Sequence, residues 1–436
     1  MSPLAELAAT RQDALRIFQA GIAAADPYQA VKHHLDPKLF DGYSKVHLIA
    51  FGKAACGMIQ AASEIIPAEK RSGRGIAVTN YENVTTIDHV DVFGAAHPLP
   101  DAEGYKAARL IAERVKNAKQ NELVLVLVSG GGSALIPYPA GQITLAEKIA
   151  ATDLLLASGA SINQINCVRK HLSQLKGGGL ARLATPAGLH ALILSDVLGD
   201  DLSAIASGPT VADHTTYNDA IAVFTAKGVW EKVPRNVQRH LEQGKLGAIA
   251  ETPKPGDDVF RNVGHTLIGS NTISLNAALK AAQDLGYETH LYSAYLCGEA
   301  KVEAEKLVGH AKGLSINKPL GLLAGGETTV SLKGSGRGGR NQEMALAFAL
   351  AGQQHGLIGN WVFLSGGTDG RDGPTDAAGG LVDRDTLKRM IRADIIPLDL
   401  LENNDSYTAL TASDDLLMTG ATGTNVADLQ ILLIRP

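Results

Sequence analysis

Short apolar runs, each followed by a glycine-rich loop and then a helical pattern, recur along this chain. The run Leu123–Val128 alternates leucine with valine without a polar interruption, which predicts a strand buried on both faces. Strands that alternate with helices in this way predict a parallel α/β sheet. Further strands are predicted near 45–51, 75–80, 88–98, 190–196, 265–271, 289–294, 320–330, 361–370 and 416–434.

The alternation is interrupted once. Residues 214–262 are less regular, and the segment 251–258, ETPKPGDD, is rich in proline and aspartate, which is typical of a linker. We therefore predict two α/β domains with Rossmann-like, mostly parallel sheets, divided into residues 1–255 and 256–436.

Composition narrows the class of protein. The 436 residues are 45% hydrophobic and 19% charged, and a net charge of −5 gives no reason to expect nucleic acid or an acidic membrane as partner. The N-terminal segment reads as an amphipathic helix, not a secretory signal. The three cysteines lie far apart, without a C-x-x-C pair, which fits a reducing cytoplasm. We expect a soluble cytoplasmic protein with small-molecule partners; a homo-oligomer stays open.

The 47 glycines are the unusual part of the composition, and they cluster after apolar runs. The first such loop of interest follows the 123–128 strand. Its backbone N–H groups and two hydroxyls suit an anion, although a tight strand–helix turn explains the loop as well. It has neither the Walker sequence nor the G-x-G-x-x-G fingerprint. Its residues are Ser129, Gly130, Gly131, Gly132 and Ser133.

A second glycine-rich loop, within residues 324–346, carries charge. Glu327 follows a buried strand, where a carboxylate is uncommon unless it is paired or holds a metal. Arg337 and Arg340 lie just before a helix, whose N-terminus already attracts anions. Together with Asn341 they suit a phosphate or carboxylate; the alternative is a flexible surface loop capped by Asn341.

The loop 365–380 is the acidic counterpart. Asp369, Asp372 and Asp376 are spaced through it directly after a strand. Carboxylates that converge repel each other unless a cation lies among them, and Mg²⁺ prefers oxygen ligands. The alternative is a set of Asx-turns, which Asp and Gly form readily in loops.

Three candidates stand in the first half of the chain. Lys53 lies in the glycine turn before a helix, where a lysine can reach a phosphate or carboxylate. Arg169, Ser173 and Lys176 share the i, i+4, i+7 spacing of one helical face, so they could present a cationic edge. Asp196 ends a strand and is a candidate general base, metal ligand or cap.

Seven motifs together resemble the glycerate 2-kinase family, whose C-terminal half is called the MOFRL domain. The resemblance covers nearly the whole chain in the right order, with the exception of residues 214–262. It implies a two-domain enzyme with an interdomain cleft, which uses ATP and Mg²⁺ to phosphorylate the 2-hydroxyl of D-glycerate. It also implies catalytic roles for Lys53 and Arg340. The motifs are FGKAA (51–55), SGGGSAL (129–135), VRKHLSQLKGGGLA (168–181), SDVLGDDLSAIASGPT (195–210), GGETTV (325–330), GGRNQE (338–343) and TDGRDGPTDAAG (368–379).

The resulting hypothesis gives each candidate a role. The 129–133 loop holds the nucleotide phosphates or glycerate, Lys53 and Arg340 stabilise charge on the transferring phosphoryl group, and Asp196 receives the hydroxyl proton. Arg169 or Lys176 holds the glycerate carboxylate. Mg²⁺ is held by some of Glu327, Asp369, Asp372 and Asp376. The alternatives are an NAD(P)H-dependent hydroxypyruvate reductase, which the missing G-x-G-x-x-G disfavours, and a non-catalytic nucleotide or sugar-acid sensor.

Overall fold

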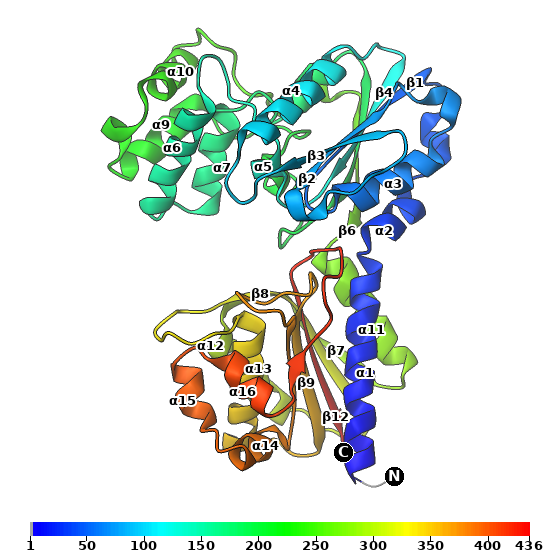
Figure 1. Ribbon diagram of the computed structural model, residues 1–436, viewed down its shortest axis with the longest axis vertical. Coiled ribbons are helices and arrows are strands. Elements are labelled where there is room, and N and C mark those ends of the chain that lie inside the picture. Colours follow the sequence, from blue (N-terminus) through cyan, green and yellow to red (C-terminus); the bar gives the residue numbers. More distant parts are fainter. Residues whose placement is uncertain (1–2) are drawn as a thin grey trace. The chain divides into compact units, whose positions relative to one another are not determined.

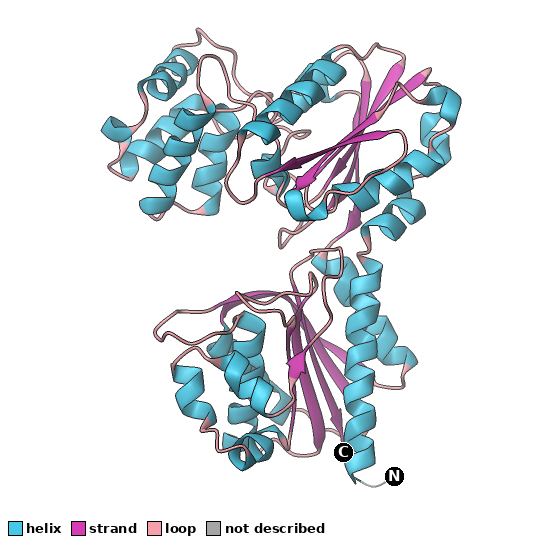
Figure 2. Cartoon of the chain, in the orientation of Figure 1, coloured by secondary structure: helices cyan, strands magenta, loops and turns pink. Residues whose placement is uncertain are grey.

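The computed structural model describes residues 3–436, which form two compact units. We call residues 27–268 the central unit, and residues 3–26 with 269–436 the terminal unit. Each unit is a six-stranded sheet packed with helices, which confirms the predicted α/β class (Figures 1 and 2).

The two units differ from the predicted division 1–255 and 256–436. Helix α1 (Pro3–Ala24) packs against the sheet of the terminal unit, because its apolar residues, Phe18 among them, belong to that core. The Pro/Asp-rich segment is a loop that leads into β6 (Val263–Gly269), the edge strand of the central sheet. The true boundary therefore follows β6 instead of preceding it.

The central sheet has the strand order β3-β2-β1-β4-β5-β6. The pairings β1–β2, β2–β3, β1–β4 and β4–β5 are all parallel. The order reverses between β1 and β4, which is the kind of switch point where open α/β sheets bind ligands. The strands are β1 (Lys45–Phe51), β2 (Gly75–Asn80), β3 (Val90–Ala95), β4 (Glu122–Val128), β5 (Gly188–Leu194) and β6.

Helices of the central unit form two groups. Helices α4 and α8 pack against the sheet in one apolar cluster, and α3 contacts β1 and β2. Helices α6, α7, α9 and α10 build a second core of their own, so the less regular stretch 214–262 contains the helices α9 and α10. The helices are α2 (Pro27–His34), α3 (Ala55–Ile65), α4 (Ala102–Lys116), α5 (Gly132–Leu135), α6 (Leu145–Ala157), α7 (Ile162–His171), α8 (Gly179–Ala184), α9 (Tyr217–Ala226) and α10 (Arg235–Lys245).

The terminal sheet has the order β11-β10-β9-β12-β8-β7 and is mixed. Only β7–β8 is parallel among the pairings, so the expectation of a mostly parallel sheet is corrected here. The reason is β12, which runs antiparallel between β8 and β9. The strands are β7 (Glu288–Glu299), β8 (Leu320–Thr329), β9 (Asn360–Gly367), β10 (Gly379–Asp383), β11 (Leu416–Leu417) and β12 (Asp428–Arg435).

This register brings three chain segments to one sheet edge. Asp428, the first residue of β12, is paired with Gly326 near the end of β8 and with Gly367 at the end of β9. The loops after β8 and β9 therefore meet at the point where β12 begins. These are the loops that carry Arg340 and the acidic residues.

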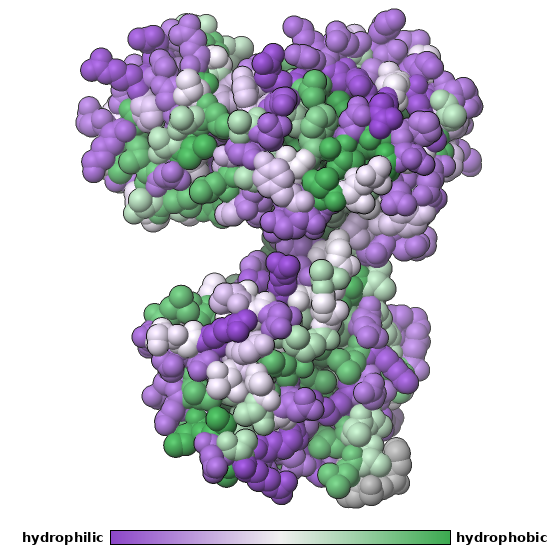
Figure 3. All heavy atoms as spheres, in the orientation of Figure 1, coloured by the Kyte–Doolittle hydropathy of each residue, from purple (hydrophilic) through white to green (hydrophobic). Residues whose placement is uncertain are grey.

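Helices cover both faces of the terminal sheet, as Figure 1 shows. Helices α1 and α11 pack on one face, and α12, α13 and α16 on the other. In Figure 3, the visible surface of both units is largely hydrophilic, with scattered hydrophobic residues. The remaining helices are α11 (Asn271–Asp284), α12 (Ala300–Lys312), α13 (Arg340–Gln354), α14 (Thr386–Arg392), α15 (Pro397–Glu402) and α16 (Ser406–Ala412).

Across residues 3–436, none of the helices combines the length and the apolar character that crossing a membrane requires.

Candidate active site

The loops that follow β1 and β4 are locked together at the switch point of the central sheet. The Lys53 N–H donates to the Gly130 carbonyl over 2.9 Å, and the Ala54 N–H donates to Ser129 Oγ over 3.1 Å. Gly52 has a φ of +123°, and a Cβ there would run into Ser129. The glycines thus let the two loops approach closely, and this fixes the backbone that carries Lys53.

Ser129 is part of this lock. Its N–H donates to the Phe51 carbonyl and its hydroxyl accepts from Ala54, while the residue is buried. Its polar groups therefore hold the β1 loop in place, and a contact of Ser129 with a bound anion stays a prediction.

Asp196, directly after β5, lies against the same loop. A Cβ on Gly130 would overlap the Asp196 carboxylate, so the loop needs glycine at this position. Burial raises the pKa of Asp196, and the nearby charge of Lys53 opposes that shift. A carboxyl with a raised pKa beside a lysine is a reasonable proton acceptor.

The rest of the 129–133 loop turns into the short helix α5. Gly131 has a φ of +82°, and a side chain there would press on His97 and Lys53. Ser133 Oγ lies 2.6 Å from Ser207 Oγ, which donates in turn to Asn166 Oδ1 over 3.1 Å. Ser207 itself has a left-handed φ of 60°, the kind of backbone strain that gathers near functional sites.

A pocket of about 320 Å³ opens beside this loop. Gly131 and Ser133 line it together with three cations, Lys148, Arg169 and Lys176. Lys148 Nζ and Lys176 Nζ are buried and have no hydrogen-bond partner among residues 3–436. Because a buried ammonium without a partner is costly, an anion in the pocket would stabilise their charged forms.

The electrostatics agree with the geometry. Burial lowers the pKa of Lys176 well below its ordinary value, and the charges of Lys148 and Arg169 lower it further. Burial and the charge of Arg169 lower the pKa of Lys148 to about 7. Burial also lowers the pKa of Arg169. An anionic ligand would remove this mutual repulsion.

The sequence predicted the meeting of Arg169 and Lys176, but for the wrong geometric reason. Helix α7 ends at His171, so Lys176 follows it in a turn and the two share no helical face. The sequence analysis missed Lys148. Its signal is a lysine in phase with Ala151 and Leu155 on the buried side of α6.

Arg340 is the first residue of α13 in the terminal unit, and it is paired on both sides. Its Nε and Nη2 donate to the fully buried Asp428 over 2.6 and 2.9 Å, and Nη1 lies 2.8 Å from Glu327. Burial alone would lower the pKa of Arg340, but the two carboxylates raise it instead. Asp428 was not among the predicted residues.

Asn341 and Asp372 are hydrogen-bonded to each other. The Asp372 carboxylate accepts from the backbone N–H groups of Asn341 and Gln342 over 3.1 and 2.8 Å. The Asn341 side chain donates to Asp372 and accepts from Ser365. Asp372 thus caps α13 and Asn341 ties the cap to β9, while the substrate role of Asn341 and the metal role of Asp372 stay predictions.

The remaining predicted metal ligands do not converge either. Asp376 accepts from the Tyr407 hydroxyl over 2.8 Å, Asp369 accepts from the Arg371 N–H, and Glu327 pairs with Arg340. Within residues 3–436, no group of three or more His, Cys, Asp or Glu side chains is arranged to hold a metal. Glu327 and Asp372 already have protein partners, in Arg340 and in the backbone N–H groups at the start of α13, and a metal role of the four carboxylates stays a prediction.

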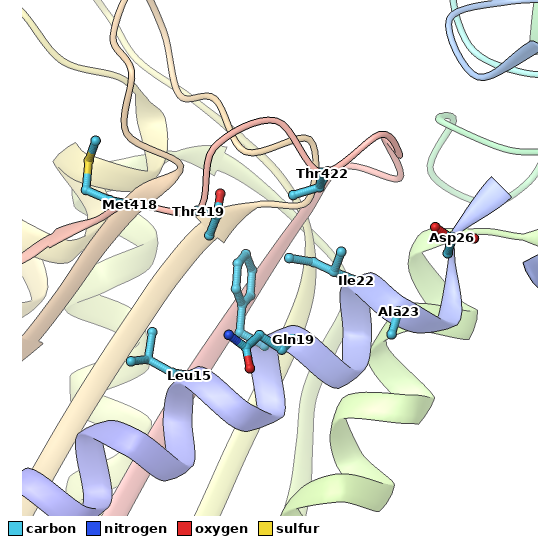
Figure 4. Close-up of a pocket in the computed structure, with 9 residues that line it drawn as sticks. Leu15, Gln19, Ile22, Ala23, Asp26, Met418, Thr419 and Thr422 are labelled. Atoms are coloured by element: carbon cyan, nitrogen blue, oxygen red, sulfur yellow. The ribbon is translucent and has the colours of Figure 1, made fainter. Parts of the chain in front are cut away.

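A further pocket in the terminal unit, of about 420 Å³, lies between α1 and the loop 418–422 (Figure 4). Its walls are largely apolar, from Leu15, Ile22 and Met418 among others, and of the described residues that line it only Asp26 is charged. It gathers none of the residues predicted from the sequence.

The sequence matches two known protein families. Residues 13–242 match a domain of unknown function, DUF4147, and residues 320–428 match the MOFRL family. The glycerate 2-kinase of Pyrococcus horikoshii is 41% identical over 97% of both chains. The crystal structure of glycerate kinase from Thermotoga maritima superposes with a TM-score of 0.89, at 41% identity, and covers 98% of this chain and 99% of its own. A relative from Agrobacterium vitis, 43% identical over 97% of this chain and 94% of its own, is provisionally named a hydroxypyruvate reductase.

The fold and the pocket define an α/β protein with a pocket lined by cationic side chains beside the switch point of a parallel sheet. The similarity to these relatives extends over nearly the whole chain, and it therefore shows the family as well as the fold class. The chain belongs to the glycerate kinase family, which confirms the resemblance found in its motifs.

Proposed function

We propose that this protein is an ATP-dependent glycerate 2-kinase that converts D-glycerate and ATP to 2-phosphoglycerate and ADP. The names of the relatives support the reaction. The observation that carries it for this chain is the pocket at the switch point, where two buried lysine ammonium groups without partners await an anion. The ligand partners in this proposal are small molecules, and a cytoplasmic location is supported by the three unpaired cysteines.

The roles of the residues follow from their places. Arg169 and Lys176 bind the carboxylate of glycerate in the pocket, and Ser133 lies at its wall. Asp196, whose pKa is raised by burial, accepts the proton of the attacking hydroxyl. Lys53, fixed by the locked loops beside Asp196, stabilises charge on the transferring phosphoryl group.

Arg340 has the same electrostatic role in the proposal, and its guanidinium is held rigidly by Asp428 and Glu327. A rigid cation that is already oriented needs little reorganisation when it binds a phosphoryl group. Mg²⁺ belongs to the proposal only as a requirement of kinase chemistry, since no cluster of carboxylates in residues 3–436 is arranged to hold it.

A two-reaction assay tests the proposal. One sample contains ATP, Mg²⁺ and D-glycerate, and ADP formation is coupled to NADH oxidation; the other contains NADH and hydroxypyruvate only. We expect ADP only when ATP, Mg²⁺ and D-glycerate are all present, with a phosphorus spectrum of the product that matches 2-phosphoglycerate. NADH oxidation by hydroxypyruvate without ADP formation would favour the reductase, and binding without either reaction would favour the sensor.

The reductase is the weaker candidate on the structure. The central sheet has the strand order of dinucleotide-binding proteins, but the loop after β1 reads Gly52-Lys53-Ala54 and lacks the glycine fingerprint that such a cofactor needs. The switch point is occupied instead by the locked loops that present Lys53.

A further inference from the structure

The pocket of the central unit holds more positive charge than the proposed acceptor needs. D-glycerate carries one carboxylate, whereas Lys148, Arg169 and Lys176 all line the pocket. Asp153 is the only carboxylate among the described lining residues, and it is exposed at the rim. Two of the three basic side chains are therefore left without a counter-ion when glycerate is bound.

Lys148 accounts for part of this excess. It reaches the pocket from α6, a different element from the one that carries Arg169. Only 5% of its surface is exposed, and its ammonium group has no partner. Burying a charge in this way is unfavourable unless a ligand of opposite charge completes the site.

Phosphorylated glycerate matches the charge of the pocket. The product carries one carboxylate and a phosphate with a charge of about −2 at neutral pH, which makes it close to a trianion. We propose that Lys148 binds the phosphate group of the phosphorylated ligand, so that the pocket holds 2-phosphoglycerate more tightly than D-glycerate. The identity of the ligand rests on the proposed function, whereas the preference for a phosphate group rests on the pocket alone.

The protonation of Lys148 supports this assignment. Its pKa of about 7 in the unliganded protein rises when a phosphate lies beside it, so the lysine takes up a proton with the product. The product then has to leave against these contacts, and we expect it to inhibit the enzyme in competition with glycerate.

Calorimetric titration of the full chain without nucleotide tests the proposal. Each probe is titrated by itself: 2-phosphoglycerate, D-glycerate, inorganic phosphate and, in separate runs, ATP and ADP. The variants are Lys148→Met and a control, Lys106→Met. Lys106 is an exposed lysine on α4 whose only recorded ion pair is with Glu103. We expect Lys148→Met to weaken 2-phosphoglycerate binding about 10- to 100-fold, which is typical for the loss of a hydrogen bond between charged groups. Glycerate binding should stay nearly unchanged, and the control should change neither.

Three results would overturn the proposal. Equal losses for glycerate and 2-phosphoglycerate would assign Lys148 to the carboxylate. A loss of ATP or ADP binding with intact product binding would assign it to the nucleotide phosphates. A lower melting temperature of unliganded Lys148→Met would show that the ammonium already has a structural partner, because removing an unpartnered buried charge should leave the fold as stable or more so.

The test also separates this proposal from the proposed function. A wild-type protein that shows no kinase activity but a phosphate preference dependent on Lys148 would contradict the function and support the site. If the protein is an active kinase and Lys148→Met leaves the preference for phosphate intact, the proposed function is supported and the proposed role of Lys148 is contradicted.

Discussion

At the scale of single residues, the charged residues of the candidate site differ most in whether another protein side chain already pairs with them. Lys148 and Lys176 are buried cations without one, whereas Arg340 is clamped by Asp428 and Glu327. The same kind of substitution therefore has different consequences at these positions: a loss of binding at the first two, and a loss of stability at the third.

Substitution of Lys53 tests its role in catalysis, because we expect it to change the rate without changing the stability of the protein. Its side chain is half-buried beside Asp196, outside the apolar core. We expect Lys53→Ala to lower kcat by about 10²- to 10³-fold, as removal of one electrostatic contact to a transition state does. The melting temperature should stay near that of the wild type. A variant with unchanged kcat and a raised KM would reassign Lys53 to substrate binding.

Substitution of Arg340 tests its contribution to the stability of the protein as well as to activity. Arg340→Ala leaves Asp428 buried and unpaired, which costs about 3–5 kcal/mol of unfolding free energy. The double variant Arg340→Ala with Asp428→Asn should recover most of this loss, because the neutral amide does not need the guanidinium. Urea unfolding of the two variants measures the difference. An equal loss in both would mean that the ion pair is not the cause.

The lysines of the pocket predict a particular pH dependence of stability. The pKa of Lys148 falls from the ordinary lysine value of 10.5 to about 7 in the folded protein. Between these two values the unfolded chain binds more protons than the folded one, so the free energy of unfolding rises with pH. Lys176 shifts in the same direction.

Urea unfolding of the unliganded protein at several pH values between 7 and 9.5, well within that window, measures this slope. We expect a positive slope in the wild type, a smaller one in Lys148→Met and no change in Lys106→Met. A flat wild-type profile would mean that the two ammonium groups are solvated in the free protein.

At the scale of elements, helix α13 depends on a cap from a distant loop. Asp372 accepts from the first two backbone N–H groups of the helix after Arg340. The helix N-terminus also explains why a carboxylate is stable there, because its unpaired N–H groups attract negative charge.

Asp372→Ala should therefore destabilise the protein by about 1–2 kcal/mol, the usual cost of losing an N-cap side chain. Asp376→Ala is the control, since this exposed residue contacts only the Tyr407 hydroxyl among the recorded hydrogen bonds. Melting curves recorded without divalent cations decide the point. A change that appears only when Mg²⁺ is added would identify Asp372 as a metal ligand after all.

At the scale of the whole molecule, the N-terminal helix belongs to the terminal unit although the central unit follows it in the chain. Arg11 on α1 lies within 2.5 Å of Asp383 and 2.9 Å of Asp415, both of which are buried. Arg389 pairs with the same two aspartates. Helix α1 is thus joined to this unit by charge as well as by apolar contacts.

We expect Arg11→Ala to lower the unfolding free energy of the terminal unit by about 1–3 kcal/mol, with Arg389 limiting the loss. Arg16→Ala on the same helix is the control, because Arg16 is 67% exposed and its ion pair with Asp13 is long, at 3.9 Å. Calorimetry separates the two units if they unfold in separate steps. A shift in the central unit alone would contradict the assignment of α1.

The sequence by itself determined the features that are encoded by neighbouring residues. Apolar runs such as Leu123–Val128 predicted buried strands, glycines after them predicted close loop contacts, and the ordered motifs identified the family. These features are local, because apolar runs and turn glycines are patterns of residues that are adjacent in the chain.

Only the tertiary structure decided which charges are paired and which are not. Arg340 and Asp428 are 88 residues apart, so nothing near Arg340 reveals that its charge is already neutralised. The direction of β12 likewise depends on its two neighbours in the sheet, and it pairs Asp428 with the ends of β8 and β9. Lys148 became a candidate only when the fold buried its ammonium group beside Arg169 and Lys176. Burial and pairing are sums over residues that only folding brings together, and no local pattern contains them.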